Sequence, residues 1–157
     1  MQHPIILALD TSTDACSVAL CTHNQTFNKF VVEPQAHSKL LLGMIDELLQ
    51  QADLSLKNVD AFAFGRGPGS FTGVRIAASV VQGLALGVNK PVIAVSSLQA
   101  LAQQAANKHE TLNILPMLDA RMHEIYWGFY KVNKLRLAET KSADSLQKPE
   151  SLIVDAS

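Results

Sequence analysis

The chain has no excess of either charge and very little cysteine. Its 157 residues include 13 Lys and Arg against 14 Asp and Glu, giving a formal net charge of -1. Proteins that hold nucleic acid unaided need clustered basic residues, so any RNA role of this chain is expected to need help from a partner. The only cysteines, Cys16 and Cys21, lie on one expected strand and point to opposite faces, too far apart for a disulfide. This usage favours a reducing cytoplasm.

Local signatures of metal and nucleophilic chemistry are also missing. The five histidines form no HxxxH or HExxH pattern, and the chain contains no CxxC. A zinc or iron site therefore has no local signature. In Gly69-Ser70-Phe71-Thr72-Gly73 the serine lies one position away from that of a GxSxG elbow. We expect no catalytic residue, no metal ligand and no required cofactor.

Long apolar runs are likewise not found. No segment approaches the roughly 18 apolar residues that a membrane span requires. The first four residues lack the basic region of a signal peptide, and the apolar run at residues 5–9 has only the length of a strand. With 48% hydrophobic and 17% charged residues, the chain is expected to be a cytoplasmic globular protein without membrane contact.

The apolar periodicity predicts a strand meander followed by alternating helices and strands. The continuous apolar run at residues 5–10 is expected to be a strand buried on both faces. The expected strands are 5–10, 16–20, 26–32, 59–64 and 91–95, and the expected helices are 38–52, about 75–89 and 97–107, with Ser38 as the N-cap of the first. This order predicts an α/β fold of the actin-like or ribonuclease-H-like (ASKHA) type, with a mixed sheet and helices on its faces.

The strand pattern restarts after His109. Apolar stretches at residues 112–118, 125–132 and 135–138 predict a second meander, and residues 152–154 are expected to begin one more strand. We therefore predict a first subdomain over residues 1–108 and a second over 109–157. Because no helices follow its meander, the second subdomain is expected to be incomplete.

A glycine-dense turn, residues 65–75, leads from a predicted strand into a helix. Glycine lets another backbone or a phosphate approach closely, and a helix N-terminus offers free N–H groups to an anion. Asp10 closes the first strand and opens a Thr-Ser-Thr turn. Two interpretations stand: a nucleotide or anion cleft, or a tight connection in which Asp10 or Thr11 caps its own turn and Arg75 forms a structural salt bridge. The cleft would be formed by Asp10, Thr11, Ser12, Gly67, Gly69 and Arg75.

Two helices carry more apolar or small residues than one sheet contact needs. The stripe of the helix at 38–52 is unusually wide, and glycines within the following helix are unfavourable unless close packing compensates. Packing inside the domain and packing against another subunit both explain the pattern. The candidates for a dimer interface are Leu41, Leu42, Ile45, Leu49, Val81 and Leu84.

Several stretches closely resemble the TsaB (YeaZ) family of tRNA threonylcarbamoyladenosine biosynthesis. The most specific is Gly67-Pro68-Gly69-Ser70-Phe71-Thr72-Gly73-Val74-Arg75. The others are Ile6-Leu7-Ala8-Leu9-Asp10-Thr11-Ser12, His37-Ser38-Lys39-Leu40-Leu41, Pro91-Val92-Ile93-Ala94-Val95-Ser96-Ser97-Leu98 and Leu118-Asp119-Ala120-Arg121. Members of the family usually extend well beyond the length of this chain.

The resemblance implies an actin-like fold of two subdomains and a non-catalytic scaffold role. It also implies a homodimer when alone, a heterodimer with the catalytic paralogue TsaD through helices of the first half, and a ternary complex with the ATPase TsaE. Matched to the paralogue's HxxxH motif, the two histidine positions fall on Ser97 and Leu101, which cannot replace the imidazole ligands. The alternatives are a module that binds ATP or ADP without turnover, and a peptidase or nucleotide hydrolase.

Overall fold

The computed structural model describes residues 3–152, which form two compact units that divide after Val95. The predicted division was between residues 108 and 109, so the structure differs by one helix. That helix, α3 (Ser97–Lys108), buries Leu98, Ala102 and Ala106 against strands that follow it in the chain. Its apolar stripe, rather than its position after the first sheet, decides where it packs.

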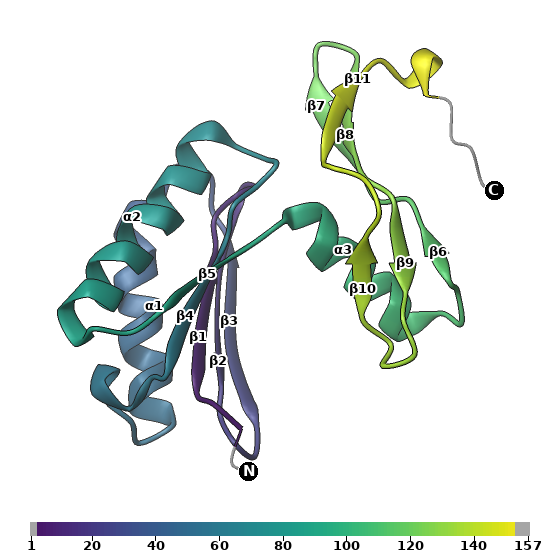
Figure 1. The fold of residues 1–157 in the computed structure, drawn as a ribbon. Coiled ribbons are helices and arrows are strands. Elements are labelled where there is room, and N and C mark those ends of the chain that lie inside the picture. The colour runs from purple at the N-terminus through teal and green to yellow at the C-terminus, as the bar shows by residue number, and fades with distance from the viewer. Residues whose placement is uncertain (1–2, 153–157) are drawn as a thin grey trace. The chain divides into compact units, whose positions relative to one another are not determined.

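The first unit contains a five-stranded mixed sheet (Figure 1). The sheet order is β3-β2-β1-β4-β5; β1, β2 and β3 form an antiparallel meander, and β4 and β5 continue from β1 in parallel. This is the predicted mixed sheet. The strands are β1 (Ile6–Asp10), β2 (Ala15–Cys21), β3 (Thr26–Val32), β4 (Ala61–Gly65) and β5 (Val92–Val95).

Both helices of the first unit pack on one side of this sheet (Figure 1). α1 (His37–Gln51) lies against β2, α2 (Phe71–Val88) lies against β4, and a short 3-10 helix (Leu56–Asn58) precedes β4. Leu7 and Leu9 of β1 are buried in this core, whereas Ile6 and Ala8 are only half-buried. The prediction that the first strand is buried on both faces is therefore wrong, because its residues alternate between a covered face and a less covered one.

The predicted N-cap of α1 is also wrong. Ala36 precedes the helix and makes no side-chain cap hydrogen bond, while Ser38 lies inside the first turn. The opening residue of the helix is His37, whose ring is buried. Its role is described with the candidate site below.

The second unit contains α3 and two three-stranded antiparallel sheets of short strands, of order β10-β9-β6 and β11-β8-β7, in place of the predicted second meander (Figure 1). The core joins Leu98 and Ala102 of the helix to Tyr130, Val132 and Ala138 of the strands. Of the predicted strand at residues 152–154, Ile153 and Val154 lie outside the described residues. The elements are β6 (Asn113–Ile114), β7 (Met117–Arg121), β8 (Glu124–Trp127), β9 (Tyr130–Val132), β10 (Ala138–Thr140), β11 (Ser145–Gln147) and a 3-10 helix (Pro149–Ser151).

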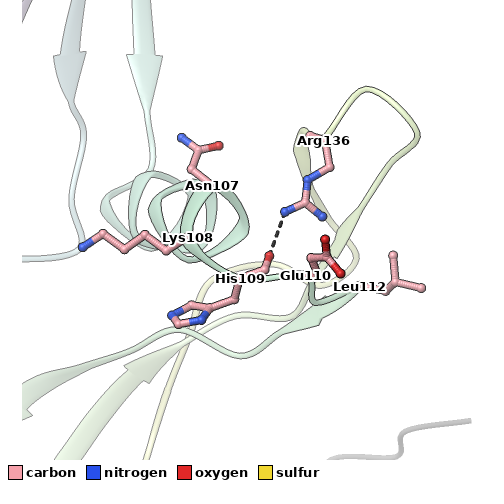
Figure 2. Close-up of a pocket in the computed structure, with 6 residues that line it drawn as sticks. All are labelled: Asn107, Lys108, His109, Glu110, Leu112 and Arg136. Carbon is pink, nitrogen blue, oxygen red and sulfur yellow. Dashed lines mark hydrogen bonds between the residues drawn. The ribbon is translucent and has the colours of Figure 1, made fainter.

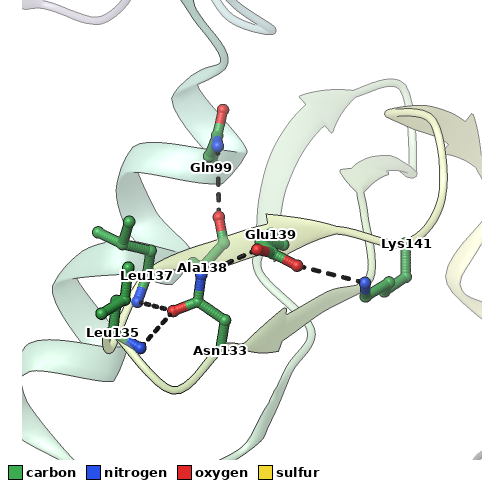
Figure 3. A network of polar contacts seen from close by, with 7 residues as sticks. All are labelled: Gln99, Asn133, Leu135, Leu137, Ala138, Glu139 and Lys141. Carbon is green, nitrogen blue, oxygen red and sulfur yellow. Dashed lines mark hydrogen bonds and ion pairs between the residues drawn. The ribbon is translucent and has the colours of Figure 1, made fainter.

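Polar side chains hold the β9–β10 hairpin against α3 (Figure 3). Gln99 Nε2 donates to the carbonyl of Ala138 (3.3 Å), and the N–H of Ala138 donates to Gln103 Oε1 (2.8 Å). In the turn, Asn133 Oδ1 accepts from the N–H groups of Leu135 (2.8 Å) and Leu137 (2.9 Å). The N–H and the carbonyl of Ala138 in β10 are thus hydrogen-bonded to side chains of α3, so they are not available to pair with another strand.

Candidate functional site

The turn between β1 and β2 is organised by Asp10. Its Oδ1 accepts hydrogen bonds from both the N–H and the hydroxyl of Ser12, each at 2.7 Å. An aspartate that binds the backbone two residues ahead forms an Asx turn. The side chains of Thr11 and Ser12 in this turn are buried. The interpretation that Asp10 caps its own turn is the one that this geometry supports.

The glycine loop after β4 lies directly on this turn. A Cβ added at Gly65 would overlap the Asp10 carboxylate, and one at Gly69 would overlap the carbonyl oxygen of Ser12. That same carbonyl accepts a hydrogen bond from the N–H of Ser70 at 2.6 Å. Gly65 therefore leaves room for the Asp10 carboxylate, and Gly69 leaves room for the backbone of Ser12.

The first turn of α2 is joined to the same β1–β2 turn. The Thr11 hydroxyl donates to the carbonyl of Gly73 (2.7 Å), and a Cβ at Gly73 would overlap the Thr11 carbonyl oxygen. Ser70 caps the helix, because its Oγ accepts from the N–H of Gly73 (3.2 Å). The N–H groups that start α2 are thus partly satisfied inside the protein.

His37, at the start of α1, holds the turn from a third side. Its Nε2 lies 2.8 Å from the carbonyl oxygen of Thr13; since a carbonyl only accepts, Nε2 carries the proton. Within residues 3–152, the buried Nδ1 has no hydrogen-bond partner. The sequence did not single out His37 for this role, because nothing in its local pattern indicates a contact 24 residues away.

Four of the six predicted cleft residues, Asp10, Thr11, Ser12 and Gly69, do come together, and Gly67 belongs to the same loop as Gly69. Asp10, Thr11 and Ser12 meet the glycine loop, where Gly67 has a left-handed φ of 84°. Arg75 does not join them: its guanidinium carbon lies 3.2 Å from the centroid of the Phe71 ring, and its Nη1 contacts the Phe71 carbonyl at 3.4 Å. The predicted structural salt bridge of Arg75 is therefore wrong for the described residues, because the guanidinium contacts Phe71, one turn earlier, instead of a carboxylate.

The six candidates for a dimer interface differ in how far the structure buries them. Leu41, Ile45, Leu49 and Val81 lie in the core of the first unit, so they are corrected to internal residues. Leu84 is half-buried, and Leu42 is 55% exposed. Periodicity alone could not choose between the two faces because both carry leucine.

Three helix glycines lie in open space. A Cβ at Gly43 of α1, or at Gly83 or Gly87 of α2, would meet nothing within 4 Å among the described residues. Close internal packing therefore does not explain them. Beside them Leu86 is 82% exposed. We call Leu42, Gly43, Gly83, Leu86 and Gly87 the outer helix face.

α2 is also long and apolar enough to cross a membrane by length and composition, with a mean hydropathy of 1.5 over its 18 residues. The prediction that no segment reaches this length is wrong by that criterion. α2 connects the parallel strands β4 and β5 and packs on their sheet, although only 22% of it is buried. Exposed residues of α2 therefore lie on the side of the helix away from its buried residues Ala77, Val81 and Ala85.

A hollow of about 580 Å³ lies at the end of α3 (Figure 2). Arg136 projects into it and donates from Nη2 to the carbonyls of Ala106 and of His109 (2.7 Å). A cation at a helix C-terminus satisfies its free carbonyls and its dipole. The arginine thus has a structural explanation. Throughout residues 3–152, no group of three or more His, Cys, Asp or Glu side chains is arranged to hold a metal ion.

Comparison with known proteins identifies the family. The family model described as "TsaD: tRNA N6-adenosine threonylcarbamoyltransferase" matches residues 31–155. A Haemophilus influenzae protein named tRNA threonylcarbamoyladenosine biosynthesis protein TsaB is 48% identical over 87% of this chain, and its Escherichia coli K12 namesake is 42% identical over 92%. The chain belongs to the TsaB (YeaZ) family.

A solved structure agrees with this assignment. YeaZ from Pseudomonas aeruginosa superposes with a TM-score of 0.91 at 44% identity, covering 99% of this chain and 73% of that one. The predicted actin-like, ribonuclease-H-like fold class is thereby confirmed. The chain spans 58% of the length of the H. influenzae relative and 63% of the E. coli one.

Proposed function

We propose that this chain is a non-catalytic scaffold subunit in the synthesis of N6-threonylcarbamoyladenosine at tRNA position A37. It acts by pairing with the catalytic paralogue TsaD, and TsaE completes the assembly. The relatives named TsaB support the pathway. The outer helix face is the observation that carries the pairing, because exposed leucines beside open glycines fit closely packed helices of a second protein.

The spacing of α2 strengthens this argument. Ile76, Val80, Gly83 and Gly87 recur at intervals of four, three and four residues and therefore share one side of the helix. Ile76 and Val80 are half-buried. At Gly83 and Gly87 no side chain covers the helix backbone on that side. A partner helix placed there approaches the backbone of α2 directly. In the absence of TsaD the same face would support a homodimer.

The non-catalytic part of the proposal rests on two positions of α3. Ser97 and Leu101 stand where the paralogue carries its metal-binding histidines, and a leucine offers no atom to a metal. The glycine loop gives independent support, since Gly65 and Gly69 make room for Asp10 and Ser12 of the chain's own β1–β2 turn. A nucleotide-binding module remains the alternative, and calorimetry with ATP and ADP separates it from a scaffold.

Reconstituted tRNA modification tests the proposed function. TsaD and TsaE from the same organism are combined with tRNA and threonylcarbamoyl-adenylate, with and without this chain. Product is expected only when the chain is present, and the chain alone is expected to produce none. Equal product without the chain would overturn the scaffold role, and product from the chain alone would show that it is an enzyme.

A further inference from the structure

Strand β3 (Thr26–Val32) lies at one edge of the first sheet (Figure 1). It pairs with β2 at all 7 of its positions, and within the described residues no strand pairs with its other side. The backbone N–H and C=O groups that point to that side can therefore hydrogen-bond to a further strand. The opposite edge, β5, is shorter, with 4 residues.

This edge lacks the usual protection against strand pairing. Natural proteins protect an edge with proline, a bulge or an unpaired charge. β3 contains no proline, and its pairing with β2 runs without a register shift. Its one charged residue, Lys29, forms an ion pair with Glu47 of α1. On the face of the sheet that carries no helix, Phe30 is 66% exposed and Val32 is 64% exposed.

We propose that β3 pairs with β3 of a second copy of this chain, antiparallel and about a two-fold axis at Val31. In this register Phe30 lies opposite Val32 of the second copy, and the symmetry repeats the pair. Lys29 lies opposite Glu33, the exposed residue that follows the strand. Aromatic residues opposite β-branched residues, and opposite charges, both stabilise neighbouring antiparallel strands. One surface patch that complements itself is what a two-fold interface requires.

Charge selects this register over its neighbours. An axis at Lys29 would place two lysines opposite each other, and an axis at Phe30 would place Glu33 opposite Phe27. Lys29 and Glu33 meet when the axis lies at Val31. Within residues 3–152 the Glu33 carboxylate has no recorded partner, and the Lys29 ammonium has donors for a second carboxylate beside Glu47.

Helix α1 leaves room for the second copy. The helix packs chiefly on β2, the strand next to the edge. In a continuous sheet the two β2 strands would stand three strand spacings apart, roughly 14 Å, whereas packed helices meet at about 8–10 Å. The ladder is short, so we expect a weak contact that forms at protein concentrations well above those on a sizing column. β3 shares no residue with the outer helix face, so this contact does not depend on the proposed function.

Cysteine cross-linking of the full chain tests the register. Val31→Cys places two thiols at the axis, where opposed Cα atoms lie about 4.5–5.5 Å apart, within disulfide range. Asn28→Cys is the control: this position is more exposed, yet its two copies would stand roughly 20 Å apart. Both changes are made in a Cys21→Ser chain, so that the half-buried native thiol does not react. Under oxidised glutathione the Val31 variant should form at least tenfold more covalent dimer, and equal cross-linking of the two variants would overturn the proposal.

Charge reversal gives a test that does not alter the strand itself. Glu33→Lys should raise the dissociation constant of self-association at least tenfold at low salt and less at high salt, as measured by sedimentation velocity. Glu110→Lys makes the same charge change at an exposed position of the second unit and is the control. Both are measured in a Leu42→Glu chain, so that pairing through the outer helix face does not contribute. A monomeric Leu42→Glu chain at high concentration, or undiminished association of the Glu33 variant, would show that copies do not meet through β3.

Discussion

Thr11 and Gly73 make two contacts with each other, one through the Thr11 side chain and one through its backbone. The Thr11 hydroxyl donates to the Gly73 carbonyl at 2.7 Å, while the Thr11 carbonyl fills the space where Gly73 would carry a Cβ. Residues 62 positions apart thus join the first strand turn to the first turn of α2. The glycine is required there by the protein's own backbone, whatever else approaches the loop.

Gly73→Ala is expected to destabilise the fold by about 1–3 kcal/mol, because a rigid carbonyl must move. Gly43→Ala, a helix glycine with open space around it, should instead stabilise by up to about 1 kcal/mol. Urea unfolding of the two variants measures the difference. Similar effects at both positions would show that the fit between Gly73 and Thr11 is loose.

Gly83→Leu tests whether the outer helix face pairs with a partner. The free chain should keep its stability or gain slightly, because the position is open and leucine favours helix. Association with TsaD should fall at least tenfold, because the side chain blocks close helix approach. Ala100→Leu, at an exposed position of α3, is the control. Unchanged association of the Gly83 variant would remove α2 from the interface.

Asp60 is expected to make the stability of the first unit depend on pH. The hydrogen bond from the Ile5 N–H (2.9 Å) and the nearby Lys90 ammonium lower the pKa of the Asp60 carboxyl. A pKa lower in the folded than in the unfolded state adds stability above the unfolded value, and that stability is lost as pH falls through the folded one. Asp60→Asn should therefore lose less melting temperature than wild type between pH 7 and pH 3. Asp46→Asn is the control, and parallel curves for wild type and Asp60→Asn would contradict the assignment.

Asp144 joins the start of α3 to strand β9. Its Oδ2 accepts from the Ser96 hydroxyl (2.8 Å) and its Oδ1 from the Tyr130 hydroxyl (3.0 Å), both on buried side chains. Asp144→Ala removes both acceptors and should destabilise the second unit by about 2–4 kcal/mol. Amide hydrogen exchange should accelerate over α3 and β9 and remain unchanged in β1 and β2. Uniform acceleration in both units would mean that they unfold together.

The strand and helix order could be predicted from the sequence because apolar periodicity is local. The third strand was placed at residues 26–32 and is found at Thr26–Val32. The predictions that failed concerned contacts between residues far apart in the sequence. Arg75 turned to Phe71 instead of Asp10, and α3 packed on strands that follow it. The side of α1 that faces the core could not be chosen because Leu41 and Leu42 look alike until the sheet is present.

The candidate site could be predicted only in part. The sequence brought Asp10–Ser12 and the glycine loop together correctly, since both follow parallel neighbouring strands at one sheet edge. The sequence could not show which group approaches these glycines, because a glycine gives the same room to a phosphate and to a carbonyl oxygen of the chain. The buried contact of His37 with Thr13 had no local signal at all.

The mass of the complex formed with TsaD tests the central claim most directly. The chain is mixed with TsaD from the same organism and followed by light scattering on a sizing column, as wild type, as Leu42→Glu and as the control Leu135→Glu. A 1:1 species is expected for wild type and for the Leu135 variant, and separate proteins for the folded Leu42 variant. No complex with folded wild-type chain, or an undiminished complex with Leu42→Glu, would contradict pairing through the outer helix face.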